Sequence, residues 1–136
     1  MRTKADIESY LMRSHLAYEE VADSMWVVSD PANRVTNLVV KQLGPILLFR
    51  LKVIDVPDAG REALFHKLLD LNATSLLHVA YGLEEGAVVL THASEIESMD
   101  YNEFQAVVDE MAMAMTEHHE ALSPYHRPSA PPAVKA

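Results

Sequence analysis

The sequence predicts an α+β fold, in the order α-β-β-β-α-β-β-α, with helices packed mainly on one face of an antiparallel sheet. Three observations support this prediction: helical apolar spacing, runs of alternating apolar and polar residues, and clusters of turn formers between them. The chain has 136 residues, of which 49% are hydrophobic, enough for one core. We expect a single domain over residues 1–120 and a disordered, Pro/Ala-rich tail over residues 121–136.

The first predicted element is a short helix from Thr3 to about His15. Thr3 followed by Asp6 is typical of a helix start, where side chains satisfy free backbone N–H groups. Apolar residues at helical spacing then form one stripe, made of Ile7, Tyr10 and Leu11. The helix should therefore bury a single narrow face.

Three strands are expected next, over residues 25–28, 35–43 and 46–56. Turn formers follow the first strand, and Gly44-Pro45 separates the other two. If Leu43 faces Ile46, antiparallel register puts these residues on one core face: Thr36, Leu38, Val40, Gln42, Leu47, Phe49, Leu51 and Val53. The opposite face is mixed and locally basic, which suits solvent or another chain.

A second helix is expected over residues 58–72, with Asp58 as its cap. Its apolar stripe is broader than one sheet contact requires, and it consists of Leu64, Phe65, Leu68, Leu69 and Leu71. Two interpretations stay open. The stripe is either a core contact alone or, in part, the seam of a homodimer.

The remaining pattern predicts a hairpin and a last helix. With Glu85-Gly86 as the turn, Leu83 pairs with Val88, Tyr81 with Leu90 and Val79 with His92 on one face. Asp100 and Glu103 form a capping box that starts the last helix, and Met99 and Phe104 flank it as an apolar pair. Helicity is expected to fade near His118.

Composition excludes several classes of function. The formal charge of −9 disfavours nucleic acid, and fourteen of the twenty acidic residues lie within residues 55–120. The chain has no cysteine, so disulfides and thiol chemistry are ruled out. Its longest apolar run, residues 46–49, is too short to cross a membrane, and no secretory signal is evident. We expect a cytoplasmic protein without a membrane or nucleic-acid partner.

No residue cluster indicates an active site, a metal or a cofactor. The densest group of possible metal ligands combines His118, His119 and His126 with Glu117 and Glu120. Adjacent histidines on a helix point about a hundred degrees apart, so they do not share one ion, and a solvated helix end is the better interpretation. No nucleophile elbow or phosphate loop is present. We therefore expect no enzyme.

The serial order of elements resembles the type III secretion chaperone-like fold, which includes Tir-type chaperones and the YbjN family of sensory transduction regulators. The resemblance rests on MWVV at residues 25–28, ILLFRLKVIDVP at 46–57, LLDLNA at 68–73, AYGLEEGAVVL at 80–90 and MDYNEF at 99–104. It implies an acidic, cytoplasmic, non-catalytic protein that is usually a homodimer. Secretion chaperones of this type hold an extended client segment over apolar patches.

On that basis we expect a protein-binding module that holds a client or effector segment. The client surface is predicted at Ile7, Leu11 and Trp26, with residues 25–28 as an open sheet edge; the bland alternative is that Trp26 is a core residue. The homodimer seam is predicted on the second helix. Two rival functions remain open, a YbjN-like regulator that binds a folded partner and a small-ligand protein or enzyme.

Overall fold

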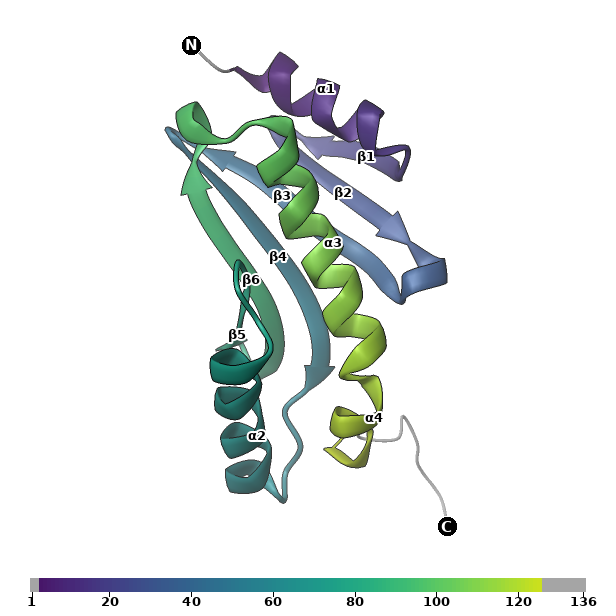
Figure 1. Cartoon of the computed structure of the whole chain (residues 1–136), viewed down its shortest axis with the longest axis vertical. Coiled ribbons are helices and arrows are strands. Elements are labelled where there is room, and N and C mark those ends of the chain that lie inside the picture. The colour runs from purple at the N-terminus through teal and green to yellow at the C-terminus, as the bar shows by residue number, and fades with distance from the viewer. Residues whose placement is uncertain (1–2, 126–136) are drawn as a thin grey trace.

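The computed structural model describes residues 3–125 and has an α+β architecture, as the sequence predicts. Six antiparallel strands form one sheet in the order β1-β2-β3-β4-β6-β5, and α1, α2 and α3 lie on one side of it (Figure 1). The strands are β1 (Ala17–Ala22), β2 (Met25–Asp30), β3 (Val35–Leu43), β4 (Ile46–Asp55), β5 (Ala80–Glu84) and β6 (Ala87–Glu95). The helices are α1 (Lys4–Ser14), α2 (Arg61–Thr74), α3 (Tyr101–Glu117) and α4 (His119–Leu122).

The predicted element order missed one strand, β1. It forms a hairpin with β2, so four strands precede α2 instead of three. The strand at residues 25–28 is therefore not an edge, because β1 covers one side of it and β3 covers the other. The reason is physical: every side chain of β1 is exposed, so no burial imposes an apolar alternation on its sequence.

The core lies between the sheet and the helices. The Phe49 and Phe104 rings are 5.5 Å apart, which places the first turn of α3 on the centre of β4. Tyr10 joins α1 to the same cluster, because its ring lies 5.6 Å from that of Phe104. Its hydroxyl also donates to the backbone oxygen of Met99, at 3.1 Å. Aromatic contacts thus fix α1 and α3 to each other and to the sheet.

The predicted registers are confirmed near the turns. Leu43 pairs with Ile46, and both Leu83 with Val88 and Tyr81 with Leu90 pair across the Glu85-Gly86 turn. Both turn residues have positive φ, 51° and 79°, as a two-residue hairpin turn requires. The expected pair of Val79 with His92 falls outside β5, which begins at Ala80.

Farther from the turn, the core face of β4 differs from the prediction. A register shift between Lys52 and Ile54 puts Ile54 into the core and leaves Val53 only half-buried. Strict alternation predicted Val53 as a core residue. A bulge adds one residue to the strand, so the residues after it point to the opposite face from the one that alternation predicts. The bulge could not be deduced from an apolar run in which both residues are aliphatic.

Helix starts are well encoded at both ends of the chain. Capping boxes form at Thr3 with Asp6 and at Asp100 with Glu103, as predicted. In α2 the cap is Gly60 at φ 77°, two residues after the predicted Asp58, and no side chain bonds there. The helix consequently begins at Arg61.

The boundary between domain and tail lies later than residue 120. After α3 ends at Glu117, α4 follows at once, and its Leu122 is buried in the core. Tyr125 packs against the same core. Residues 121–125 therefore belong to the folded domain, because Leu122 has an apolar partner surface to cover. The rest of the predicted tail, residues 126–136, lies outside the described residues.

Candidate partner-binding surfaces

The residues predicted to meet a client, Ile7, Leu11 and Trp26, lie together inside the core. Ile7 and Leu11 belong to α1 and Trp26 to β2, and all three are buried members of one hydrophobic cluster. None of them is accessible at the surface. The indole Nε1 of Trp26 has no hydrogen-bond partner, and no other buried side-chain polar atom in the described residues is unpaired. Direct contact between a client and these side chains would require α1 to separate from the sheet.

The accessible surface at the same end of the molecule is the outer edge of β1. Met12 on α1 and Tyr18 and Val21 on β1 are large apolar side chains exposed to solvent. Alternate backbone N–H and C=O groups of an edge strand point away from its neighbour and are free to pair with another strand. In the described part of the chain, no side chain bonds to these outward groups of β1. This edge is open.

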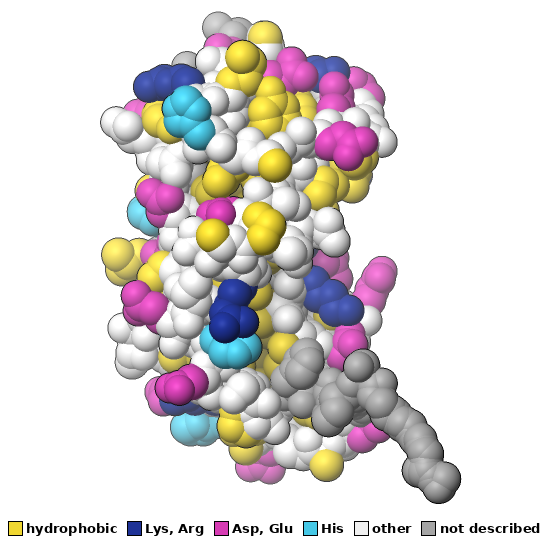
Figure 2. Space-filling model, turned by 90° about the vertical axis from the view of Figure 1, so that its right-hand side faces the viewer, with side chains coloured by type: hydrophobic (Ala, Val, Ile, Leu, Met, Phe, Trp, Pro, Cys, Tyr) yellow, Lys and Arg dark blue, Asp and Glu magenta, His cyan; other side chains and the backbone are white. Residues whose placement is uncertain are grey.

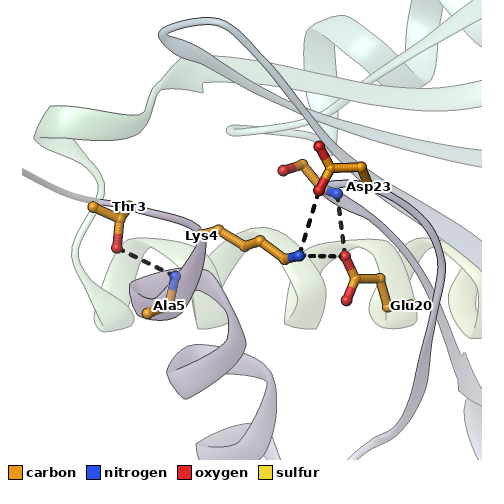
Figure 3. A network of polar contacts seen from close by, with 6 residues as sticks. Thr3, Lys4, Ala5, Glu20 and Asp23 are labelled. Carbon is orange, nitrogen blue, oxygen red and sulfur yellow. Dashed lines mark hydrogen bonds and ion pairs between the residues drawn. The ribbon is translucent and has the colours of Figure 1, made fainter.

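An ion-pair cluster holds the start of α1 against the β1–β2 turn (Figure 3). Lys4 Nζ lies 2.7 Å from a carboxylate oxygen of Glu20 and 3.5 Å from one of Asp23. The hydrogen bond between the Lys4 and Glu20 side chains raises the pKa of Lys4 and lowers the pKa of Glu20. The cluster is solvent-exposed, so it positions α1 more than it stabilises the fold.

The opposite edge of the sheet, β5, is capped by side chains. In a two-residue hairpin the pairs alternate, so the backbone groups of Tyr81 and Leu83 point outward. The Asn72 amide bonds both outward groups of Tyr81, at 2.7 Å to its N–H and 3.2 Å to its C=O. Glu110 accepts the N–H of Val79 at 2.7 Å. Little backbone is therefore left for a foreign strand on this edge.

Exposed apolar side chains surround this capped edge. Leu69 on α2 is 68% exposed, Leu77 in the loop after α2 is 88% exposed, and Leu83 on β5 is 55% exposed. Glu110 fixes the loop that carries Leu77, because its carboxylate also accepts the N–H groups of residues 77 and 78. We call Leu69, Leu77 and Leu83 the α2–β5 patch.

The helix α2 divides its predicted dimer stripe between core and surface. Leu64, Leu68 and Leu71 are buried in the protein's own core, and Phe65 is partly buried against it. Among the five, only Leu69 is exposed. The breadth of the stripe thus has an explanation within one chain, because α2 packs into the curve of the sheet at its β5 end (Figure 1).

The sheet face away from the helices is not wholly polar. Val39, Leu48 and Arg50 are half-buried on it, and Val89 is buried. Arg50 Nε lies 3.9 Å from a carboxylate oxygen of Glu84, which partly neutralises this face. Its mixed character agrees with the predicted pattern of the strands.

The histidines at the end of α3 do not form a metal centre in the described residues. His118 is only 6% exposed and bonds through Nδ1 to the Tyr81 hydroxyl at 2.8 Å, whereas His119 is exposed. Burial lowers the pKa of His118, and the charge of Lys67 acts in the same direction. Across residues 3–125, no three possible ligands converge on one point. The predicted solvated helix end is therefore wrong for His118, which the α3–α4 turn carries inward; His126 lies outside the described residues.

A family model matches residues 1–128 and decides the family. The chain belongs to the CesT_Tir_1 family. No curated protein sequence matches it. Within residues 3–125, none of the helices has both the length and the apolarity that crossing a membrane needs.

Solved structures share the fold of this CesT_Tir_1 chain at low identity. A chain of the heterodimeric ExoU–SpcU complex, from the type III secretion system of Pseudomonas aeruginosa, has a TM-score of 0.67 and 21% identity, and the match covers 90% of this chain and 99% of that one. YbjN from E. coli, described as a putative transcription regulator, has a TM-score of 0.64 and 12% identity over 88% and 93%. A chain of the HopA1–SchA chaperone–effector complex has a TM-score of 0.65 and 12% identity over 86% and 92%.

The sequence of this CesT_Tir_1 chain held a weak signal for its open edge. Asp23 and Ser24 form the two-residue turn between β1 and β2, and Ser24 adopts φ 56°. Such turns are strongly indicated in a sequence by pairs such as Asn-Gly, and Asp-Ser is not one of these pairs. The capping role of Asn72 was missed as well. An asparagine inside a predicted helix next to a predicted hairpin gives no indication of which backbone it will reach.

Proposed function

We propose that the protein is a non-enzymatic, chaperone-like binding module that holds an extended segment of a client protein along the outer edge of β1. One observation carries this proposal: β1 is an uncapped edge strand with exposed Met12, Tyr18 and Val21 beside it. An extended segment could add a strand there, gaining backbone hydrogen bonds along the edge and side-chain contacts at alternate positions. Membership of the CesT_Tir_1 family and the fold shared with the HopA1–SchA chaperone–effector complex support it.

The buried residues Ile7, Leu11 and Trp26 take a second role in this proposal. They hold α1 on the sheet beside β1, so a client strand at β1 would meet α1 as its nearest neighbour. A buried donor without a partner costs about 1–3 kcal/mol, and the Trp26 indole N–H is such a donor. A client that displaces α1 would relieve this cost and contact all three residues.

A homodimer through the α2–β5 patch belongs to the same proposal. The patch is apolar, lies beside a capped sheet edge and is presented by a loop that Glu110 fixes. Side-chain packing across a two-fold axis suits such a surface better than strand addition does. One edge of the sheet would then bind the client, and the other would bind the second copy of the chain.

A YbjN-like regulator that binds a folded partner is the second candidate, and the TM-score of 0.64 to YbjN favours it. The two candidates differ in the state of the partner. A client held at β1 must be extended, whereas a regulator's partner keeps its own fold. In either case we place the protein in the cytoplasm.

The test begins with isolation of the tagged protein from its native host and identification of the proteins that remain bound. Limited proteolysis of the complex should leave one protected segment of the partner, and that segment, made as a peptide, should bind with similar affinity. Trp26 emission should change on saturation, because the client edge adjoins α1. A partner that binds only when intact and folded would favour the regulator, and the absence of any bound protein would contradict both.

A further inference from the structure

A hollow of about 390 Å³ opens at the end of the molecule opposite the β1–β2 turn. It lies between Arg34, which precedes β3, the end of β4 and the junction of α3 with α4. Apolar side chains make up most of its lining, namely Val53, Ile54, Ala114, Met115 and Leu122. Its size falls within the range of about 300–1,000 Å³ that small-molecule sites occupy. Neither the β1 edge nor the α2–β5 patch contributes to it.

The backbone departs from regular geometry on two sides of this hollow. The bulge in β4 brings the consecutive residues Val53 and Ile54 to the same hollow, which a regular strand could not do because its side chains alternate. Arg34 adopts φ 62°, a left-handed conformation that is uncommon for a side chain of its kind. Bulges and such conformations are concentrated at functional sites.

The polar groups of the hollow are basic or neutral. Besides the apolar side chains, the described residues that line it are Arg34, His118, His119 and Ser123, and none of these is acidic. This is unusual on a chain with a formal charge of −9. Figure 2 shows the side of the molecule that lies on the right in Figure 1. In its lower half, the half that contains α4 in Figure 1, basic and histidine side chains lie next to apolar ones. Glu117 acts on His118 from outside the lining.

His118 supplies a hydrogen-bond donor at this site. Burial raises the pKa of Tyr81, so its hydroxyl stays protonated. This hydroxyl can therefore donate a hydrogen bond to Nδ1 of His118, at 2.8 Å. A neutral imidazole that accepts at Nδ1 carries its proton at Nε2. Because burial lowers the pKa of His118, the neutral form prevails near pH 7. The ring therefore offers an N–H that a carboxylate oxygen can accept.

We propose that this hollow binds a small amphipathic carboxylate, with its apolar chain against Val53, Ile54 and Met115 and its head group at Arg34 and His118. The guanidinium provides charge and a planar pair of donors, which match a carboxylate. The apolar lining provides affinity in proportion to the chain length that it covers. This site is independent of the proposed client function, because no residue of β1 takes part.

The test is calorimetric titration of the full chain at pH 7.5 with hexanoate, octanoate and decanoate, and with neutral octanol as the reference ligand. Affinity should rise about fourfold per methylene until the hollow is full. Octanoate should bind about tenfold more tightly than octanol, because only the carboxylate engages Arg34. Arg34→Gln should remove most of that difference while it leaves octanol binding unchanged.

Arg13→Gln is the matched control, because Arg13 is also exposed but lies on α1, over the Tyr101 ring. It should leave octanoate binding unchanged within about twofold. Equal binding of octanol and octanoate by the unmodified chain would overturn the proposal without any variant. An equal loss from Arg13→Gln and Arg34→Gln, or no binding by any member of the series, would overturn it as well.

Discussion

The two edge strands of the sheet differ in how their outward-pointing backbone N–H and C=O groups are treated. Both β1 and β5 are edge strands, and each has three large exposed apolar side chains on or beside it. On β5 the outward groups of Tyr81 are taken by Asn72, and just before the strand Glu110 accepts the N–H of Val79. On β1 no side chain of the described residues takes this role. One edge is closed to strand addition, and the other is open.

This difference teaches how one small sheet can offer two distinct surfaces. An open edge recognises the backbone of an extended partner, whereas a capped edge with an apolar rim can be recognised only through side chains. A client at β1 and a second copy at the α2–β5 patch would therefore not compete. Substitutions at the two edges should either abolish this division or show how large it is.

The largest effect is expected from charge in the α2–β5 patch. Leu69→Glu combined with Leu77→Glu should weaken the homodimer by at least about 100-fold, because each carboxylate meets its own copy across a two-fold axis. Light scattering and sedimentation at tens of micromolar should then show a monomer. Leu43→Glu, at an exposed leucine of the β3–β4 turn, is the control and should remain dimeric. A monomeric unmodified chain would contradict the proposed seam.

A second variant should convert the closed edge into an open one. Asn72→Ala frees the N–H and C=O of Tyr81, which should cost about 1–3 kcal/mol of the free energy of unfolding. It should also promote self-association through β5, because the edge then resembles β1. Denaturant unfolding and light scattering measure the two effects. Asn33→Ala, which removes an exposed bond to Asp30, should change stability by less than about 0.5 kcal/mol.

The open edge should respond more modestly to a single charge. Val21→Glu should weaken client binding by about tenfold, because it places a carboxylate among the apolar side chains that a client would cover. Titration with the protected client segment measures the change, and the dimer should stay intact. Val21→Thr keeps the branched shape without charge and should retain most of the affinity. An unchanged affinity for Val21→Glu would place the client elsewhere.

The smallest effect concerns pH and His118, whose ring bonds to the hydroxyl of Tyr81 on β5. Burial holds the pKa of His118 below its usual value of 6.5, and Lys67 adds to this while Glu117 opposes it. His118 is therefore neutral in both states above pH 6.5. As the pH falls from there toward its folded pKa, the unfolded chain takes up the proton first and stability is lost. His118→Gln should show a smaller drop in thermal midpoint between pH 7.5 and pH 5 than the unmodified chain does, and His119→Gln should show the full drop.

Local signals allowed much of the fold to be predicted. The capping boxes at Thr3 and Asp100 and the turn at Glu85-Gly86 depend on neighbouring residues only, and all three are confirmed. Two features depend on distant residues and were missed. The strand β1 is exposed throughout, so burial left no pattern in it, and the bulge before Ile54 changes register within an aliphatic run.

The candidate surfaces were harder to predict than the fold. Apolar spacing identified Ile7, Leu11 and Trp26, but an apolar residue that packs in the core and one that awaits a partner look alike in a sequence. The distinction between the two edges depends on where Asn72 and Glu110 reach across space. No local pattern encodes such contacts.

Amide hydrogen exchange of the client complex, compared with the free protein, tests most directly whether the open edge holds the client. Binding should slow exchange at residues 17–22 of β1, because their outward N–H groups gain partners, and should leave residues 80–84 of β5 unchanged. The same pattern should persist in the Leu69→Glu, Leu77→Glu variant. Slowed exchange at β5 with none at β1 would contradict the division of the sheet into an open client edge and a capped dimer edge.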